Sequence, residues 1–459
     1  MFSIDLSNRS RRQFLQTGVA TASGLSVSGL SVNGEAAESP QLLRGKSVVV
    51  LNLQGGPTQF ETFDPKMTAP REIRSITGEV ATSIPGVTFG GTLPRLAALA
   101  HKMTIVKSYR HGISSHGPAA MHVMAGGNPT GAMMGALFAR ISGLTNASTG
   151  MPQNTLVTAR AMGDQYKELY YNSERVSQTG SLPAAYKPFD PSAGGEIVEN
   201  MKLHLEAARL GDRRGLLREL DFLRKQADLR FRAADRFQDQ AFNVLVRGVA
   251  DAFDLSKEDP RLLERYNTGA MEPSDGAKKR NSYAEMFSPV ALGHQMVLAR
   301  RLCEAGCGFV TVTCGGWDMH GGGKEFTMHD GVASLTPAVD RAVSAFIEDV
   351  DRRGLTDKIL LVITGEFGRT PRINKNGGRD HWGNLCTLAF AGGGLQMGQV
   401  VGRSDRIAGE PASTPISSSD VLATIMHVLF DIGELRVRTG VPSDVKQVLT
   451  SGQPISELL

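Results

Sequence analysis

The chain has 459 residues, of which 41% are hydrophobic and 21% are charged, and this balance excludes a wholly disordered protein. The formal net charge at pH 7 is only +4, which argues against a protein that binds nucleic acid. The sequence contains no apolar run of the roughly 18 residues that a transmembrane helix needs, so we expect no stable membrane span.

The N-terminal segment has the features of an export signal. Residues 10–16 (SRRQFLQ) carry an adjacent arginine pair, and a mildly apolar stretch rich in Gly and Ser follows over residues 17–32. The small residues Ala36 and Ala37 then offer a cleavage site. This arrangement resembles a twin-arginine signal. It predicts a signal peptide at residues 1–37 and a mature protein that is periplasmic or secreted through the twin-arginine pathway.

Strand and turn signals open the mature part of the chain. Residues 46–53 (KSVVVLNL) form a continuous apolar run that ends in a Gly-Gly-Pro turn, as buried parallel strands do. Further strands are predicted at residues 103–108 and 154–159, and a helix is predicted after His116. Over about residues 190–285 apolar residues recur at helical spacing among interleaved charges, which predicts a helical insertion that packs on the core.

Helices and strands alternate in the C-terminal half of the chain. The predicted elements are helix 291–306, strand 309–314, helix 335–354, strand 358–365, strand 386–393 and helix 417–430. Repeated strand–helix units favour a mostly parallel, doubly wound α/β sheet, with residues 38–459 forming one domain. The Gly-rich pieces lack the placement of a dinucleotide-binding loop, so no site for such a cofactor is expected.

The chain has four cysteines, which are Cys303, Cys307, Cys314 and Cys386. A disulfide is allowed in an exported protein, but no C-x-x-C motif is present. The spacing therefore favours small buried apolar side chains. Pairing among Cys303, Cys307 and Cys314 is left open.

Polar residues suited to catalysis follow the predicted strands. They are Glu61 and Asp64 after the first strand, Ser114, Ser115 and His116 after the second, Asp318 and His320 after strand 309–314, and Glu366, Arg369, Asp380 and His381 after strand 358–365. Sites in open α/β sheets lie beyond the carboxyl ends of strands, so we expect these four loops to meet.

Carboxylate oxygens and imidazole nitrogens suit a divalent metal ion such as zinc, manganese or calcium. Asp318 and His320 form a plausible pair of ligands in a Gly-flanked loop. Acids and a histidine from the later loop would complete the site, and these are Glu366, Asp380 and His381. A single histidine taken alone is more often a hydrogen-bonded structural residue.

Several motifs together resemble a known family. The motifs are GGWDMHG, EFGRTPRIN, GGRDHWG, GGPTQFETFDPK and RRLCEAGCGFVTV. With the export signal, they are similar to the bacterial family called domain of unknown function 1501, over nearly the whole mature chain. That family resembles the alkaline phosphatase/sulfatase superfamily. The resemblance implies an alkaline phosphatase-like α/β fold and a site with one or two metal ions for transfer of phosphate or sulfate esters.

The resemblance also implies a metal-ligand set. The ligands of one metal ion would be Asp318, His320 and His381. Glu61 or Asp64 would supply the first acid of a second metal ion. The acid–histidine pair of that second ion falls at Glu366–Phe367, and a phenylalanine side chain cannot bind a metal.

The nucleophile should lie where the second strand leads into a helix, because backbone N–H groups there can hold an oxyanion. Ser114 and Ser115 stand at this point, with His116 beside them as a base, a ligand or a phosphate contact. A serine-rich helix cap is the alternative interpretation. Arg369 is expected to bind the anionic ester, with a surface salt bridge as the alternative.

Two functions follow from these features. The first is an exported, metal-dependent hydrolase that acts on small or polymeric phosphate or sulfate esters. The second is a scaffold without catalytic activity that binds sulfated glycans or polymers of the cell envelope. Neither the oligomeric state nor the identity of the metal follows from the sequence.

Overall fold

The computed structural model describes residues 42–163, 165–166, 170–192, 249–280, 289–322 and 325–459. Residues Leu42–Leu459 form one compact unit. The signal peptide predicted at residues 1–37, and most of the helical insertion predicted at about 190–285, lie outside the described residues. The described end of that insertion contains the helices α9 (Ala250–Phe253), α10 (Pro260–Tyr266) and α11 (Asp275–Arg280). Among the described helices, none combines the length and the apolar character that crossing a membrane requires.

The main sheet of the described residues has seven strands in the order β11-β4-β10-β7-β1-β6-β5. The strands are β1 (Ser47–Leu53), β4 (Met103–Val106), β5 (Asn154–Val157), β6 (Phe309–Cys314), β7 (Ile359–Gly365), β10 (Leu388–Gly392) and β11 (Gln399–Val401). All of them run parallel except β10, which is antiparallel to β7 and β4. The predicted mostly parallel α/β sheet is therefore confirmed.

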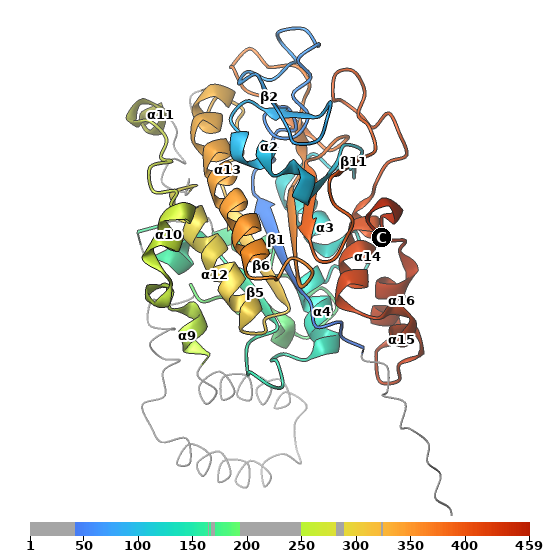
Figure 1. Ribbon diagram of the computed structural model, residues 1–459. Coiled ribbons are helices and arrows are strands. Elements are labelled where there is room, and N and C mark those ends of the chain that lie inside the picture. Colours follow the sequence, from blue (N-terminus) through green and yellow to red (C-terminus); the bar gives the residue numbers. More distant parts are fainter. Residues whose placement is uncertain (1–41, 164, 167–169, 193–248, 281–288, 323–324) are drawn as a thin grey trace, which may run out of the picture. The chain divides into compact units, whose positions relative to one another are not determined.

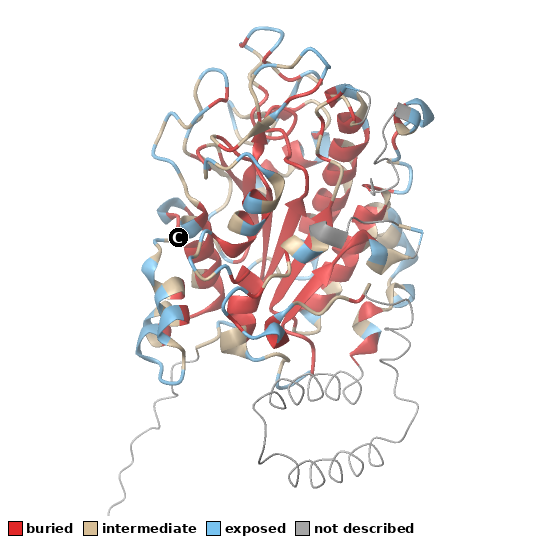
Figure 2. Ribbon diagram, turned by 180° about the vertical axis from the view of Figure 1, so that it is seen from behind, coloured by how far each residue is buried: buried red, intermediate tan, exposed pale blue. Residues whose placement is uncertain are grey.

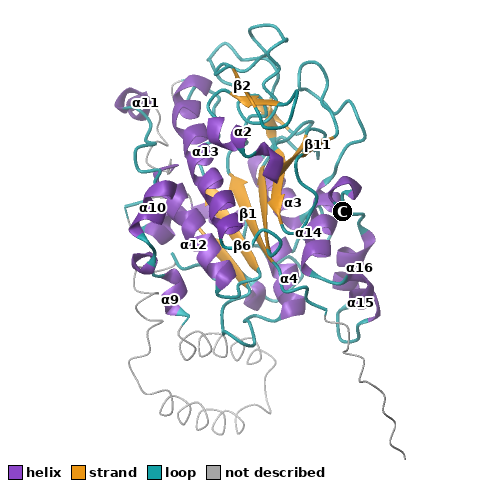
Figure 3. Ribbon diagram, in the orientation of Figure 1, coloured by secondary structure: helices purple, strands orange, loops and turns teal. Residues whose placement is uncertain are grey.

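Helices cover both faces of this sheet (Figures 1 and 3). The first face carries α2 (Pro94–Ala98), α12 (Leu292–Glu304) and α13 (Met328–Arg352), and α10 packs against α12 and α13. The second face carries α3 (His116–Ala125), α4 (Met134–Ser142) and α14 (Ser418–Leu429). The C-terminal helices α15 (Ile432–Val437) and α16 (Ser443–Ser451) pack together, with α16 against α14, and the short α5 (Tyr170–Arg175) contacts α3.

Strand β1 shows why the strand sequences are continuously apolar. Val49 and Leu51 belong to the core under α12 and α13, whereas Val48 and Val50 belong to the core under α4 and α14. All four side chains are completely buried, as is most of the sheet in Figure 2. A strand that is covered on both faces needs apolar residues at every position, which removes the alternation of a half-exposed strand.

The loops gather at one end of the sheet, the upper end in Figure 1. Two small antiparallel pairs lie among these loops, β2 (Glu79–Ala81) with β3 (Thr88–Gly90), and β8 (Gly368–Arg369) with β9 (His381–Trp382). Because β10 is antiparallel, the segment that leads into it begins at the edge where the parallel strands end. This topology brings the loops after β1, β4, β6 and β7 to the same edge, as predicted.

All four cysteines are buried and free. Burial raises the pKa of the Cys307 thiol to about 11 and that of Cys386 to about 12. These side chains are therefore unreactive apolar residues of the core, as the spacing favoured, and they form no disulfide in this structure.

The start of α14 provides a test of the fold. The Ser417 hydroxyl accepts a hydrogen bond from the backbone N–H of Asp420, and the Asp420 carboxylate accepts one from the backbone N–H of Ser417. We expect Ser417→Ala to lower the free energy of unfolding by about 1 kcal/mol, because it removes this capping box. Denaturant titration should show almost no change for the control Ser451→Ala, which alters an exposed serine at the end of α16. Equal losses in the two variants would contradict the capping role.

Candidate functional site

Three histidines and one aspartate converge at the carboxyl edge of the sheet. The Oδ1 atom of Asp318 lies 3.0 Å from Nε2 of His320 and 3.2 Å from Nε2 of His381. The Oδ2 atom of Asp318 lies 3.2 Å from Nε2 of His116, and the Nε2 atoms of His320 and His381 are 2.8 Å apart. We call these four residues the histidine–aspartate cluster. Each side chain is 21–34% exposed, so the cluster is open to a solute.

The topology places each member of the cluster. Asp318 and His320 lie in the loop after β6, His116 is the first residue of α3, and His381 lies in β9. Gly55, in the turn after β1, allows the close approach of the Asp318 loop. Its φ is +106°, and a Cβ atom there would lie 2.5 Å from the backbone nitrogen of Asp318. A side chain at this turn would therefore push Asp318 out of place.

Each histidine of the cluster presents its Nδ1 atom to an oxygen atom. The three contacts are His116 Nδ1 to Glu366 Oε2 at 2.5 Å, His320 Nδ1 to Asp380 Oδ1 at 3.1 Å, and His381 Nδ1 to the carbonyl oxygen of Ser114 at 3.1 Å. An ionised carboxylate or a carbonyl oxygen can only accept a hydrogen bond, so each Nδ1 atom carries the hydrogen. In a neutral imidazole the Nε2 atom is then left with a lone pair.

The Nε2 lone pairs and the Asp318 carboxylate therefore face one another. Such groups repel unless positive charge lies among them, and either extra protons or a metal ion can supply that charge. Histidine ligands of metal ions are held in the same way, with one ring N–H donated to a carboxylate or carbonyl oxygen. Within the described residues, the ligand atoms of His116, Asp318 and His381 lie within 4.8 Å of one another. The donor set thus fits a divalent metal ion.

The contacts within the cluster also govern its pKa values. Burial would raise the pKa of Asp318, but its hydrogen bonds with the three histidines outweigh burial and hold the pKa far below its usual range. Burial would lower the pKa of His116, yet Asp318 and Glu366 together raise it to about 9. The hydrogen bond with Asp318 raises the pKa of His320, whereas burial lowers that of His381. The raised pKa values of His116 and His320 show that these acceptors favour positive charge among them, which protons supply when no metal ion is bound.

Arg369 does not have the role expected of it. Its side chain is fully buried. Its guanidinium donates hydrogen bonds to the carbonyl oxygens of Gly55, Gly56, Trp317 and Arg379, and to Oδ1 of Asp318. All three nitrogen atoms are thus bound inside the protein, and none is free for an anionic ester. Arg369 is instead a positioning residue that orients Asp318 and balances its charge.

Phe367 packs against the histidine–aspartate cluster on the side of the protein core. Its ring is completely buried, and its centre lies 4.4 Å from that of His381 and 5.2 Å from that of His116. The sequence placed this phenylalanine where a second metal ion would need a histidine. In the structure the ring packs against two imidazoles and fixes their planes, so this position contributes shape and no ligand.

Ser114 and Ser115 are both exposed at the junction between β4 and α3. The backbone N–H of Gly383 donates a 2.9 Å hydrogen bond to Oγ of Ser114. Ser115 stands at the N-cap position of α3, but its side chain makes no capping hydrogen bond. Within the described part of the chain, neither hydroxyl contacts a histidine or a carboxylate that could act as a base.

The two acids after β1 lie apart from the cluster. Glu61 is completely buried, and its carboxylate accepts hydrogen bonds from the hydroxyls of Ser75 and Thr77 at 2.6 Å and from the backbone of Ile76 at 2.8 Å. These bonds brace the turn at residues 75–77.

Asp64 has cationic partners of its own. Its carboxylate pairs with Lys66 at 3.3 Å and Lys107 at 3.2 Å and accepts a hydrogen bond from Ser404. Within the described residues, neither Glu61 nor Asp64 contacts the cluster, so the expectation that one of them serves a second metal ion has no support in this geometry.

The structure also shifts the roles of three other residues. The sequence predicts His116 as a catalytic residue. In the structure its Nε2 atom faces Asp318, as do the Nε2 atoms of His320 and His381. Glu366 and Asp380, expected as ligands, instead contact the Nδ1 atoms of His116 and His320. The sequence marks all of these residues as polar and near strand ends. It does not show which side of an imidazole faces which neighbour.

Comparison with solved structures finds a sulfatase, a phosphonate monoester hydrolase and a lipoteichoic acid synthase among the similar chains. PsFucS1 sulfatase from Pseudoalteromonas sp. is 11% identical, with a TM-score of 0.35 over 83% of this chain and 67% of that chain. The phosphonate monoester hydrolase SpPMH from Silicibacter pomeroyi is 10% identical, with a TM-score of 0.36 over 89% and 77%. The lipoteichoic acid synthase LtaP from Listeria monocytogenes is 10% identical, with a TM-score of 0.34 over 89% and 76%.

Comparison with sequences gives a clearer result. No curated protein matches the chain. A family model described as "Protein of unknown function (DUF1501)" matches residues 45–459, which include every residue of the cluster. The resemblance that the motifs indicated is therefore confirmed, and the chain belongs to the DUF1501 family.

Proposed function

We propose that the protein binds a divalent metal ion at the histidine–aspartate cluster and hydrolyses phosphate or sulfate esters there. The observation that carries this proposal is the orientation of the three imidazoles. Each Nδ1 atom faces an oxygen atom, and each Nε2 atom is turned toward Asp318. The predicted export signal at residues 1–37 supports a mature protein that acts in the periplasm or outside the cell.

The donor set narrows the choice of metal. Three imidazole nitrogens and one carboxylate suit zinc or manganese, whereas calcium prefers sites built of oxygen atoms alone. Among the three metals that the sequence allowed, calcium therefore fits least well. A bound divalent ion would stabilise the negative charge that develops on the transferred phosphate or sulfate group.

The protein's own groups have separate tasks in this proposal. Glu366 and Asp380 hold the Nδ1 hydrogens of two histidines and so keep their Nε2 atoms turned inward. Arg369 fixes the Asp318 carboxylate. If a water molecule attacks the phosphorus or sulfur atom, it loses a proton to solvent, the ester bond to the alcohol oxygen breaks, and the departing alcohol takes up a proton. If an exposed serine hydroxyl attacks instead, Ser114 or Ser115, it loses its proton and forms a covalent seryl ester as the alcohol departs with a proton. A water molecule would then hydrolyse that seryl ester, which releases phosphate or sulfate and restores the hydroxyl.

A binding protein without catalytic activity remains the second candidate. It is favoured by one observation, since within the described residues no base contacts the hydroxyl of Ser114 or Ser115. In that case the imidazoles of His116 and His320, protonated in the absence of a metal ion, would hold an anionic group of a sulfated glycan or an envelope polymer. The two candidates differ in turnover and can be separated by an assay.

Metal content tests the first part of the proposal. We expect purified mature protein to contain about one zinc or manganese ion per chain, and Asp318→Asn and His381→Ala to lose it, because each removes a converging ligand. The matched control is His329→Gln, which changes an exposed histidine outside the cluster. Plasma mass spectrometry after gel filtration measures the content. Metal retained by both cluster variants would refute the assignment.

Turnover tests the second part. We expect hydrolysis of aryl sulfate or aryl phosphate by the wild-type protein, and a fall of at least about a hundredfold in kcat for Asp318→Asn. Ser114→Ala and Ser115→Ala identify the nucleophile, because only one of them should abolish turnover if a serine attacks. Absence of turnover over a broad panel of esters, together with saturable binding of sulfated glycans, would favour the binding protein.

Substitution of Glu366 tests whether the carboxylates that contact the Nδ1 atoms of the histidines support metal binding. We expect Glu366→Gln to weaken metal affinity by roughly 10- to 100-fold, because the amide loses the charge that holds the Nδ1 hydrogen of His116. Asp380→Asn should weaken it less, since the side chain of Asp380 is 59% exposed and that of Glu366 only 3%. Competition with a chelator of known affinity gives both values. Equal affinity in Glu366→Gln and wild type would mean that the contact does not position His116.

A further inference from the structure

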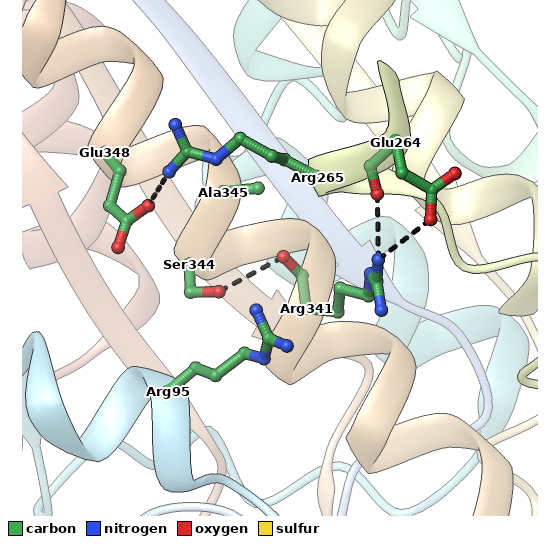
Figure 4. A pocket seen from close by; sticks show the side chains of 7 residues that line it. All are labelled: Arg95, Glu264, Arg265, Arg341, Ser344, Ala345 and Glu348. Atoms are coloured by element: carbon green, nitrogen blue, oxygen red, sulfur yellow. Dashed lines mark hydrogen bonds and ion pairs between the residues drawn. The ribbon is translucent and has the colours of Figure 1, made fainter. Parts of the chain in front are cut away.

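A second charged site lies between the helices of the first face. A cavity of about 190 Å³ is formed by residues of α2, α10 and α13. The charged and hydroxyl residues that line it are Arg95, Glu264, Arg265, Arg341, Ser344 and Glu348, as Figure 4 shows. None of them belongs to the histidine–aspartate cluster or contacts one of its residues. The cavity thus has a chemistry of its own.

The carboxylates of the cavity leave part of its positive charge unbalanced. Arg265 forms an ion pair with Glu348. Arg341 lies 3.4 Å from the carboxylate of Glu264, but that carboxylate belongs to a side chain that is 70% exposed to water. The closer contact of Arg341 is with the backbone carbonyl of Glu264, at 2.8 Å. Three guanidinium groups of the lining thus stand against two lining carboxylates, both of which are exposed to water, and Asp340 lies behind Arg95 as a further acid.

The guanidinium groups of Arg341 and Arg95 each have N–H donors that are not used in hydrogen bonds with the described residues. The Nε atom of Arg341 is buried and has no hydrogen-bond partner among the described residues. The guanidinium of Arg95 makes no ion pair within the described part of the chain, and Figure 4 shows it near Arg341 and Ser344. The buried acid Asp340 accepts hydrogen bonds from the backbone N–H groups of Arg95 and Leu96, at 3.2 and 2.8 Å, and not from the guanidinium.

We propose that this cavity binds a small oxyanion, phosphate or sulfate, between the guanidinium groups of Arg95 and Arg341. Two like charges that face one cavity repel each other, and an anion between them turns this repulsion into two attractions. Guanidinium groups match the oxygen geometry of such anions, and charge-assisted hydrogen bonds of this kind are short and strong. The Ser344 hydroxyl donates its hydrogen to the backbone carbonyl of Arg341 at 3.1 Å, so the two guanidinium groups supply the donors for the anion.

Calorimetric titration with inorganic phosphate and with sulfate, at low ionic strength, tests this site. We expect Arg95→Gln and Arg341→Gln each to weaken one binding event by about tenfold or more, because each removes a charge-assisted contact. The matched control Arg261→Gln changes an exposed arginine of α10 outside the cavity and should bind like wild type. Arg95 is exposed, so its variant should keep the wild-type unfolding temperature.

The variant His381→Ala separates this proposal from the proposed function. It should remove any anion binding at the histidine–aspartate cluster and leave the event that depends on Arg95 and Arg341. If Arg95→Gln and Arg341→Gln bind both anions as tightly as Arg261→Gln, the cavity is not an anion site. If no binding remains in His381→Ala, every anion binds at the cluster, and the proposal is overturned while the proposed function stands.

Discussion

The candidate site depends on which nitrogen of each imidazole carries its hydrogen. Oxygen atoms of Glu366, Asp380 and the Ser114 backbone take the Nδ1 side of the three histidines. The Nε2 atoms are thereby turned toward one carboxylate, where lone pairs would repel one another without a cation. The need for positive charge at this point is a direct consequence of the geometry. A divalent metal ion is the source of that positive charge which we propose.

Buried groups hold this arrangement in place from the side of the core. Arg369 donates hydrogen bonds to four backbone carbonyls and to Asp318, so it connects the turn after β1 with the loop after β6. Gly55 allows these two loops to touch. Phe367 packs against the rings of His116 and His381. The inner side of the cluster is therefore packed against the core, while its outer side is partly exposed to solvent.

Much of the fold could be predicted from the sequence because both faces of the sheet are buried. Continuous apolar runs marked the strands, and the topology of parallel strands implied that Asp318, His320 and His381 would meet. The sequence could not show whether a carboxylate would face the metal site directly or would instead contact a histidine of that site. Glu366 and Asp380 look like ligands in the sequence, yet their carboxylates face the Nδ1 atoms.

The corrected residues have partners that no sequence pattern marks. Arg369 binds mainly backbone carbonyls, which every residue has, and these are brought together only by the folded loops. Glu61 bonds to a turn at residues 75–77, and Asp64 pairs with lysines from two segments of the chain. Such contacts depend on loop conformation, which hydrophobic periodicity does not determine.

X-ray diffraction recorded on both sides of the zinc and manganese absorption edges would show whether the cluster holds a metal ion. We expect an anomalous peak within about 2.0–2.3 Å of an Asp318 oxygen and of the Nε2 atoms that face it. Crystals grown with either metal in excess that show no such peak, with the Nε2 atoms hydrogen-bonded to Asp318 alone, would contradict a metal site at the cluster.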